Sequence, residues 1–267
     1  MTAAALITLR ETLEASLMVG IMLACLERLS HEKYRIVVWL GVAVGVVGSI
    51  LCAVIFHFAF GGFTGATEQI YEGVTMLAGA GLITWMILWM MRMGRSMRAS
   101  LERDLTAYAS NDQYLGIFLL SFTSMAREGT EMVLFLHAAF LSAKSNIHHL
   151  TGVLAGITGA LLLAVLLFRG SRQLPLRTFF TSTALLLLFV GAGLVSHGIG
   201  ALQEAHLVTV LQSHAWNMST ILPEEGAIGG MLESLFGYSD HPTVLQLVSY
   251  LGYLIGAMVA WRRTKQG

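Results

Sequence analysis

The chain has 267 residues, of which 55% are hydrophobic and 12% are charged. A soluble domain carries about 25% charged residues, so the composition excludes an ordinary soluble protein and predicts an all-α polytopic membrane protein in the lipid bilayer. The apolar runs do not alternate with polar residues, which excludes a membrane β-barrel. The 16 basic and 16 acidic residues cancel, so the net charge indicates no partner, and we expect no nucleic acid to bind.

Apolar runs of about 20 residues predict seven transmembrane helices. The first run carries charges and lacks a basic segment before it, so we expect a retained helix rather than a cleaved signal. In chain order, the predicted helices are about Thr2–Leu26, Ile36–Phe60, Ile70–Met91, Tyr114–Leu141, His149–Phe168, Phe179–Leu202 and Thr243–Trp261.

The positions of the basic residues predict the orientation in the membrane. All but three of the 16 Lys and Arg residues lie in the C-terminal tail or in alternate connecting segments. Because cytoplasmic segments are enriched in Lys and Arg, we expect the C-terminus in the cytoplasm and the N-terminus outside. The opposite segments are acidic, either to concentrate cations near a transport path or as ordinary solvated charge. Their acidic residues are Glu68, Glu224, Glu225, Glu233 and Asp240.

Glycine patterns recur in the same order in the two halves of the chain, which predicts two three-helix repeats. Because the first run enters from outside and the fourth from inside, we expect the repeats to be inverted, as in many secondary transporters. Small residues at four-residue spacing are interpreted as helix-packing positions. The recurring glycines are Gly41, Gly45 and Gly48 with Gly152, Gly156 and Gly159, and Gly79 and Gly81 with Gly191 and Gly193.

These patterns divide the chain into five predicted segments. They are 1–93 (first three-helix repeat), 94–113 (cytoplasmic linker), 114–202 (second, inverted repeat), 203–242 (external segment) and 243–267 (seventh helix and basic cytoplasmic tail). The external segment is long for a loop, and we expect it to cap the entrance or dock a partner.

Two charged motifs interrupt the apolar runs, Arg10-Glu11-Thr12-Leu13-Glu14 and Arg127-Glu128-Gly129-Thr130-Glu131. An ionised side chain in mid-bilayer costs roughly 2.5–3.5 kcal/mol, so a repeated cluster indicates function. On a helix the two glutamates of a motif share a face, and the arginine pairs with the second of them. Each motif then keeps one unmatched carboxylate. Facing motifs would offer four carboxylates to a hard cation; the alternative is buried ion pairs that fix helix register. The predicted metal ligands are Glu11, Glu14, Glu128 and Glu131, with Arg10 and Arg127 pairing or tuning them.

Two Arg-Glu-x-x-Glu motifs, in the first and fourth of seven predicted helices, resemble the oxidase-dependent iron permease family, which includes the fungal high-affinity iron permease and the bacterial Efe-type inner-membrane iron permease. Further stretches resemble the bacterial branch. They are Tyr71-Glu72-Gly73, Leu82-Ile83-Thr84-Trp85-Met86, Ala201-Leu202-Gln203-Glu204-Ala205 and Leu235-Phe236-Gly237-Tyr238 with Pro242. The resemblance covers nearly the whole chain.

The resemblance implies a multi-pass protein of the plasma (inner) membrane that imports iron ions, with the four motif glutamates as iron ligands. It implies no catalytic activity and no cofactor, and a partner that is an external oxidase or a periplasmic iron-binding protein. The family usually has Gly where the first motif has Thr12, and Leu where the second has Thr130. These departures leave the metal preference open.

Other polar residues near the external ends of the predicted helices are secondary candidates for the access path or for a relay. Glu68 and Glu72 are either early ligands or carboxylates at headgroup level, and the histidines are either relays or satisfied interfacial residues. The histidines in question are His57, His137 and His197. The Met-rich inner end of the third run is interpreted as apolar filling.

Two rival functions stay open at this point. The same scaffold would suit another metal cation, such as lead or manganese. An intramembrane di-iron carboxylate enzyme is the other rival, but such sites usually bring Glu-x-x-His pairs, and the sequence contains none. The sequence also leaves open the oxidation state of the iron, the energy coupling and the oligomeric state.

Overall fold

The computed structural model describes residues 2–60, 65–141, 146–169, 176–224 and 226–266. Over these ranges the chain is helical, with no strand beyond an isolated bridge between His214 and Thr243. The elements are α1 (Thr2–Arg28), the 3-10 helix η1 (Glu32–Tyr34), α2 (Arg35–Phe60), α3 (Ala66–Ser110), α4 (Tyr114–Leu141), α5 (Asn146–Arg169), α6 (Leu176–Glu204), α7 (Ala227–Phe236) and α8 (Val244–Gln266). The predicted all-α class is confirmed.

Within the described ranges, five helices are long and apolar enough to cross a membrane; they lie in α2, α3, α5, α6 and α8. Each is apolar around most of its circumference, as expected for a helix in lipid. α1 and α4 are 27 and 28 residues long but are interrupted by the motif charges. The chain is therefore a multi-pass membrane protein.

α3 is longer than the apolar run that predicts it, because it continues as a helix through the basic stretch to Ser110. Most of the segment expected as a linker, 94–113, thus extends α3. Leu101, Leu105 and Ala109 recur at four-residue spacing and are buried against α1, α2 and α4. An apolar stripe of this period stabilises a helix outside the bilayer core as well as inside it.

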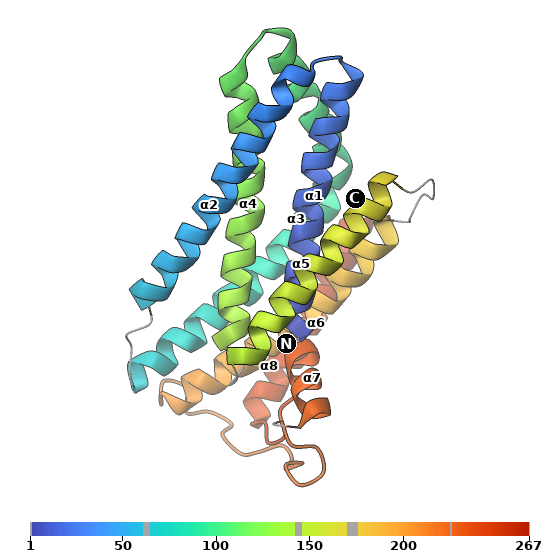
Figure 1. Ribbon diagram of the computed structural model, residues 1–267. Helices are drawn as coiled ribbons and strands as arrows, with labels where there is room; N and C mark the ends of the chain where they lie inside the picture. The colour runs from blue at the N-terminus through green and yellow to red at the C-terminus, as the bar shows by residue number, and fades with distance from the viewer. Residues whose placement is uncertain (1, 61–64, 142–145, 170–175, 225, 267) are drawn as a thin grey trace.

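The connections α1–α2 and α3–α4 lie together at one end of the molecule, and α7 with the segment after α6 lies at the opposite end (Figure 1). Polar contacts join the two connections: Lys33 Nζ is 2.6 Å from Asp112 Oδ1, and Tyr34 donates to the same oxygen. Hydrogen bonds from Lys33 and Tyr34 hold the pKa of Asp112 below its ordinary value.

The most extensive helix pairs are α1 with α5, α2 with α4, and α3 with α6. If α1, α2 and α3 correspond to α4, α5 and α6, the pair α1–α5 corresponds to the pair α4–α2. The pair α3–α6 then corresponds to itself. The glycines agree with this correspondence. A Cβ on Gly45 of α2 would lie 2.8 Å from Met125 Cβ, and one on Gly156 of α5 would lie 1.9 Å from Thr8 Oγ1. Met125 and Thr8 each lie two residues before a motif arginine, so the second helix of each half packs on the first helix of the other.

Candidate metal-binding site

The two motifs lie on the inward faces of α1 and α4, and equivalent glutamates are buried to a similar extent. Glu11 is 0% exposed and Glu128 is 1% exposed. The second glutamates are less enclosed, with side-chain exposures of 13% for Glu14 and 16% for Glu131. In both motifs the two glutamates are three residues apart and share one helix face, so the two motifs are buried in a similar way.

Three of the four motif glutamates form one cluster, in which carboxylate oxygens of Glu11, Glu128 and Glu131 all lie within 4.8 Å of one another. Four of their oxygens are buried and lack a hydrogen-bond partner within the described residues: Glu11 Oε2, Glu128 Oε1, Glu128 Oε2 and Glu131 Oε2. Buried carboxylates without partners are unfavourable, and gathering them adds like-charge repulsion. A bound cation would relieve both, and oxygen ligands suit a hard one.

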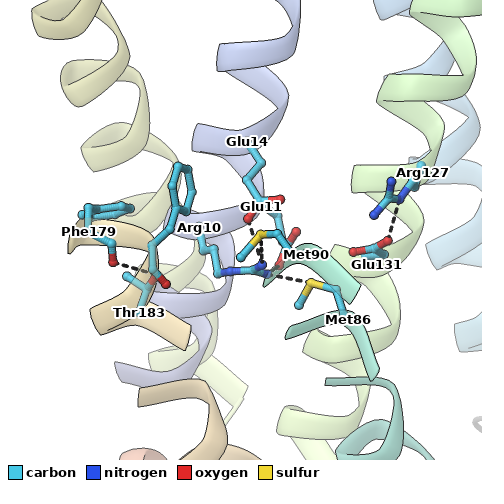
Figure 2. Close-up of polar contacts among 10 residues, drawn as sticks. Arg10, Glu11, Glu14, Met86, Met90, Arg127, Glu131, Phe179 and Thr183 are labelled. Atoms are coloured by element: carbon cyan, nitrogen blue, oxygen red, sulfur yellow. Dashed lines mark hydrogen bonds and ion pairs between the residues drawn. The ribbon is translucent and has the colours of Figure 1, made fainter. Parts of the chain in front are cut away.

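Arg10 ties the first motif together and is itself fully buried. Its Nη1 is 2.6 Å from Glu11 Oε1, and its Nη2 is 2.8 Å from Glu14 Oε1, an ion-pair distance without hydrogen-bond geometry. The same two nitrogens lie 2.9 Å from Met86 Sδ and 3.2 Å from Met90 Sδ on α3 (Figure 2). The pairing with Glu14 expected from the spacing is present, and Glu14 is not part of the three-carboxylate cluster.

Arg127 makes a different set of contacts in the second motif. Its Nε donates to Glu131 Oε1 at 2.9 Å, the pairing that the four-residue spacing predicts (Figure 2). Its guanidinium carbon lies 4.0 Å from the ring centroid of Trp89 on α3. The Arg127 side chain is 34% exposed, and both oxygens of the adjacent Glu128 are without a partner.

Comparison with known proteins identifies the family of the chain. A model of the iron permease FTR1 family matches residues 1–262. The chain belongs to the iron permease FTR1 family. The predicted resemblance to the iron permeases is thereby confirmed, and with it a place among iron transporters of the membrane.

Similar proteins include bacterial iron permeases. The ferrous iron permease EfeU of Escherichia coli O6:K15:H31 is 33% identical over 258 residues, which cover 96% of this chain and 93% of the relative. The ferrous iron permease EfeU of Yersinia pestis is 32% identical over 256 residues, covering 95% and 90%. A relative from Escherichia coli K12, 33% identical over 258 residues with 96% and 93% covered, is described as a putative inactive ferrous iron permease. No solved structure matches the chain.

Three further carboxylates, those of Glu68, Glu72 and Glu204, lie where α3 packs against α6. Glu68 is exposed and Glu72 is half-buried. Glu72 interacts electrostatically with Glu68 and Glu204. Glu204 accepts a hydrogen bond from Gln69 at 3.3 Å. The sequence did not single out Glu204 as a site residue, because only packing brings α3 and α6 together.

Two of the three histidine candidates of the permease have local partners. His137 Nε2 lies 2.7 Å from the hydroxyl of Tyr71 on α3. The Nδ1 of His197 lies 2.9 Å from the carbonyl oxygen of Gly193, one turn earlier on α6. Neither belongs to the three-carboxylate cluster. The side chain of His57 lies outside the described residues.

A second cluster occurs in the segment before α8, where ligand atoms of Glu224, Asp240 and His241 lie within 4.8 Å of one another. These groups already pair internally: the Asp240 amide donates to Glu224 Oε1 at 3.0 Å, and His241 Nδ1 hydrogen-bonds to the Asp240 carboxylate. Burial raises the pKa of Asp240, but the hydrogen bond and charge of His241 and the backbone hydrogen bonds together outweigh it and leave the pKa below its ordinary value. Internal pairing explains this cluster without a metal.

Sequence analysis missed the role of α3 at the motifs. Met86, Trp89 and Met90 contact the two arginines, whereas the Met-rich end of this run was interpreted as apolar filling. Their 86, 89, 90 spacing does place them on one helix face. Nothing in the sequence indicates that this face meets α1 and α4.

Proposed function

We propose that this permease moves iron inward across the plasma (inner) membrane through the site formed by its two motifs. The observation that carries the proposal is the group of four unpartnered oxygens from Glu11, Glu128 and Glu131, in a chain of the iron permease family. Iron is the transported substrate, and the proposal needs no bound cofactor and no enzymatic step.

The charge of the site favours a divalent cation. The two motifs contain four carboxylates and two guanidiniums, a net charge of −2 when all are ionised. One ferrous ion would neutralise this charge in a low-dielectric region, where an unbalanced charge is unfavourable. The relatives are named ferrous iron permeases, so ferrous iron is the first substrate to test.

The transport path in this proposal runs from the end of α7 toward the α1–α2 connection. The basic residues of the connecting segments support a cytoplasmic position for the α1–α2 end, and seven membrane crossings would place the N-terminus outside. Glu68, Glu72 and Glu204 would then face arriving cations and raise their local concentration. Release would follow rearrangement of the two halves around the motifs.

The proposal includes an external partner, which needs a docking surface at the outer end of the protein. An oxidase or a periplasmic iron-binding protein would deliver iron at the outer end, where the segment 203–242 lies in the proposed orientation. This segment would therefore dock the partner or cap the entrance.

Iron uptake by cells that make single-residue variants tests the proposal. We expect Glu128→Gln and Glu131→Gln to lower uptake at least about tenfold at normal membrane levels, which corresponds to about 1.4 kcal/mol. Glu14→Gln should have a smaller effect, because Glu14 lies outside the three-carboxylate cluster. Glu27→Gln is the matched control, since Glu27 is an exposed carboxylate on the same helix as the first motif. Wild-type uptake by the Glu128 and Glu131 variants would overturn the proposal.

Two further measurements separate the rival functions. Uptake of labelled iron in the presence of unlabelled iron, manganese or lead gives the order of preference among metals. Unlabelled iron should be the strongest competitor. A spectroscopically coupled pair of tightly bound iron ions would instead support the di-iron enzyme.

A further inference from the structure

The two motifs of the permease treat their first glutamates differently. In the first motif, Arg10 reaches the next residue in the chain and pairs with Glu11 at 2.6 Å. Residues at this spacing do not usually face each other on a helix, so the contact shows that a motif arginine can reach its neighbour. In the second motif, Arg127 pairs with Glu131, and Glu128 keeps both oxygens without a partner.

The surroundings of Arg127 explain why it stays away from Glu128. Its guanidinium carbon lies 4.0 Å from the ring centroid of Trp89, and aromatic ring faces attract a planar guanidinium. Trp89 is stacked on Trp85, with ring centroids 6.4 Å apart and an interplanar angle of 26°. The stacked pair on α3 therefore gives the guanidinium a supported surface to lie on.

The same face of α3 also holds the other arginine. Met86 and Met90 offer their sulfur atoms to the two terminal nitrogens of Arg10, at 2.9 Å and 3.2 Å. One helix that carries no motif thus contacts both guanidiniums. Apart from Glu14 Oε1, which lies at ion-pair distance from Arg10, the buried motif oxygens without a hydrogen-bond partner among the described residues belong to the three-carboxylate cluster.

We propose that Trp89 is a positioning residue for iron affinity, which holds Arg127 so that Glu128 stays open to the cation. This inference rests on the proposed function. Without the ring, Arg127 would be free to pair with Glu128 as Arg10 pairs with Glu11. The guanidinium would then compete with iron for the most enclosed carboxylate of the second motif.

The expected effect of removing the ring is a loss of affinity. Trp89→Leu should raise the dissociation constant for ferrous iron about three- to thirtyfold, the range that corresponds to a cation–π contact. Trp89→Phe keeps a ring with a weaker quadrupole and should lose less. In transport, the half-saturating iron concentration should rise in the same order while the maximal rate per protein changes little.

The test is binding of ferrous iron to the purified full-length protein in detergent under anaerobic conditions, so that transport competence is not needed. Trp89→Leu is compared with wild type, and then in an Arg127→Gln background. If Trp89 acts through Arg127, its replacement has no further effect in that background. An unchanged dissociation constant in Trp89→Leu, or an equal rise in both backgrounds, overturns the inference.

Two controls keep the outcome interpretable. Trp39→Leu makes the same substitution at a 54% exposed position on α2 and should bind iron as wild type does. Trp89→Met provides a second ringless variant if Trp89→Leu is not recovered folded. If Glu128→Gln abolishes binding while both ringless variants bind normally, only the role of Trp89 fails. If Glu128→Gln binds normally, the proposed function itself fails.

Discussion

At the scale of single residues, the two motif arginines are held to different degrees. Arg10 has no exposed surface and contacts two carboxylates and two sulfur atoms. Arg127 is 34% exposed and contacts one carboxylate and one ring. Arg10 and Arg127 therefore have different contacts although they occupy the same position in the motif. Arg10 holds α1 against α3, and Arg127 keeps a looser position beside an open carboxylate.

The difference predicts unequal losses of stability. Arg10→Met should lower the free energy of unfolding by about 3–5 kcal/mol, because it leaves Glu11 buried without its partner. Arg127→Met should lower it by less, since water still reaches Glu131. Thermal unfolding of the purified variants, followed by tryptophan fluorescence, measures both. Equal losses in the two variants would contradict the assignment.

At the scale of helices, glycine positions allow the close approach of α2 to α4. A Cβ on Gly41 would lie 2.2 Å from Ser121 Oγ and 2.8 Å from the carbonyl oxygen of Phe118 on α4, whereas nothing lies within 4 Å of one on Gly48. Small residues allow such close approach of helix backbones in a membrane. Gly41 and Gly45, the α2 glycines predicted as packing residues, both lie close against α4, whereas Gly48 does not.

This difference provides a matched pair of variants on one helix. Gly41→Leu should separate α2 from α4 and destabilise the fold by about 1–3 kcal/mol or more, with less folded protein in the membrane. Gly48→Leu should be tolerated because its side chain meets open space. The yield of monodisperse protein on size-exclusion chromatography compares them. Equal yields would mean that α2 and α4 do not pack as described.

The sequence predicted most helix bounds well, because apolar runs and charged breaks mark them directly. It did not predict α7, whose ten residues are too few for a membrane span, or the extension of α3, whose stripe of Leu101, Leu105 and Ala109 is masked by many charges. It predicted the pairs Arg10–Glu14 and Arg127–Glu131 but not the pair Arg10–Glu11, so the expectation of one unmatched carboxylate in each motif holds only for the second motif. The separation of Glu14 from the other three glutamates, and the contacts of Trp89, depend on how α3 packs against α1 and α4.

At the scale of the whole molecule, the pairing of α1 with α5 and of α2 with α4 interlocks the two halves. Each half supplies one motif, so neither half has the complete cluster. If the proposed site is the transport site and the two halves are repeats, this arrangement would suit alternating access, because small relative movements would change the exposure of the site to each side.

The proposed orientation predicts a labelling pattern. In a background with Cys25→Ser and Cys52→Ser, Gln212→Cys should react with an impermeant maleimide added to intact cells. Asn111→Cys, between α3 and α4, should react only after the membrane is permeabilised. The reverse pattern would place the basic connections outside and contradict the proposed direction of transport.

The central claim is that iron binds where the two motifs meet. Crystals grown anaerobically with ferrous iron, with diffraction measured at the iron absorption edge, test it most directly. The account predicts an anomalous peak bounded by Glu11, Glu128 and Glu131. An iron peak found only at Glu224, Asp240 and His241, or no peak between the motifs, would contradict it.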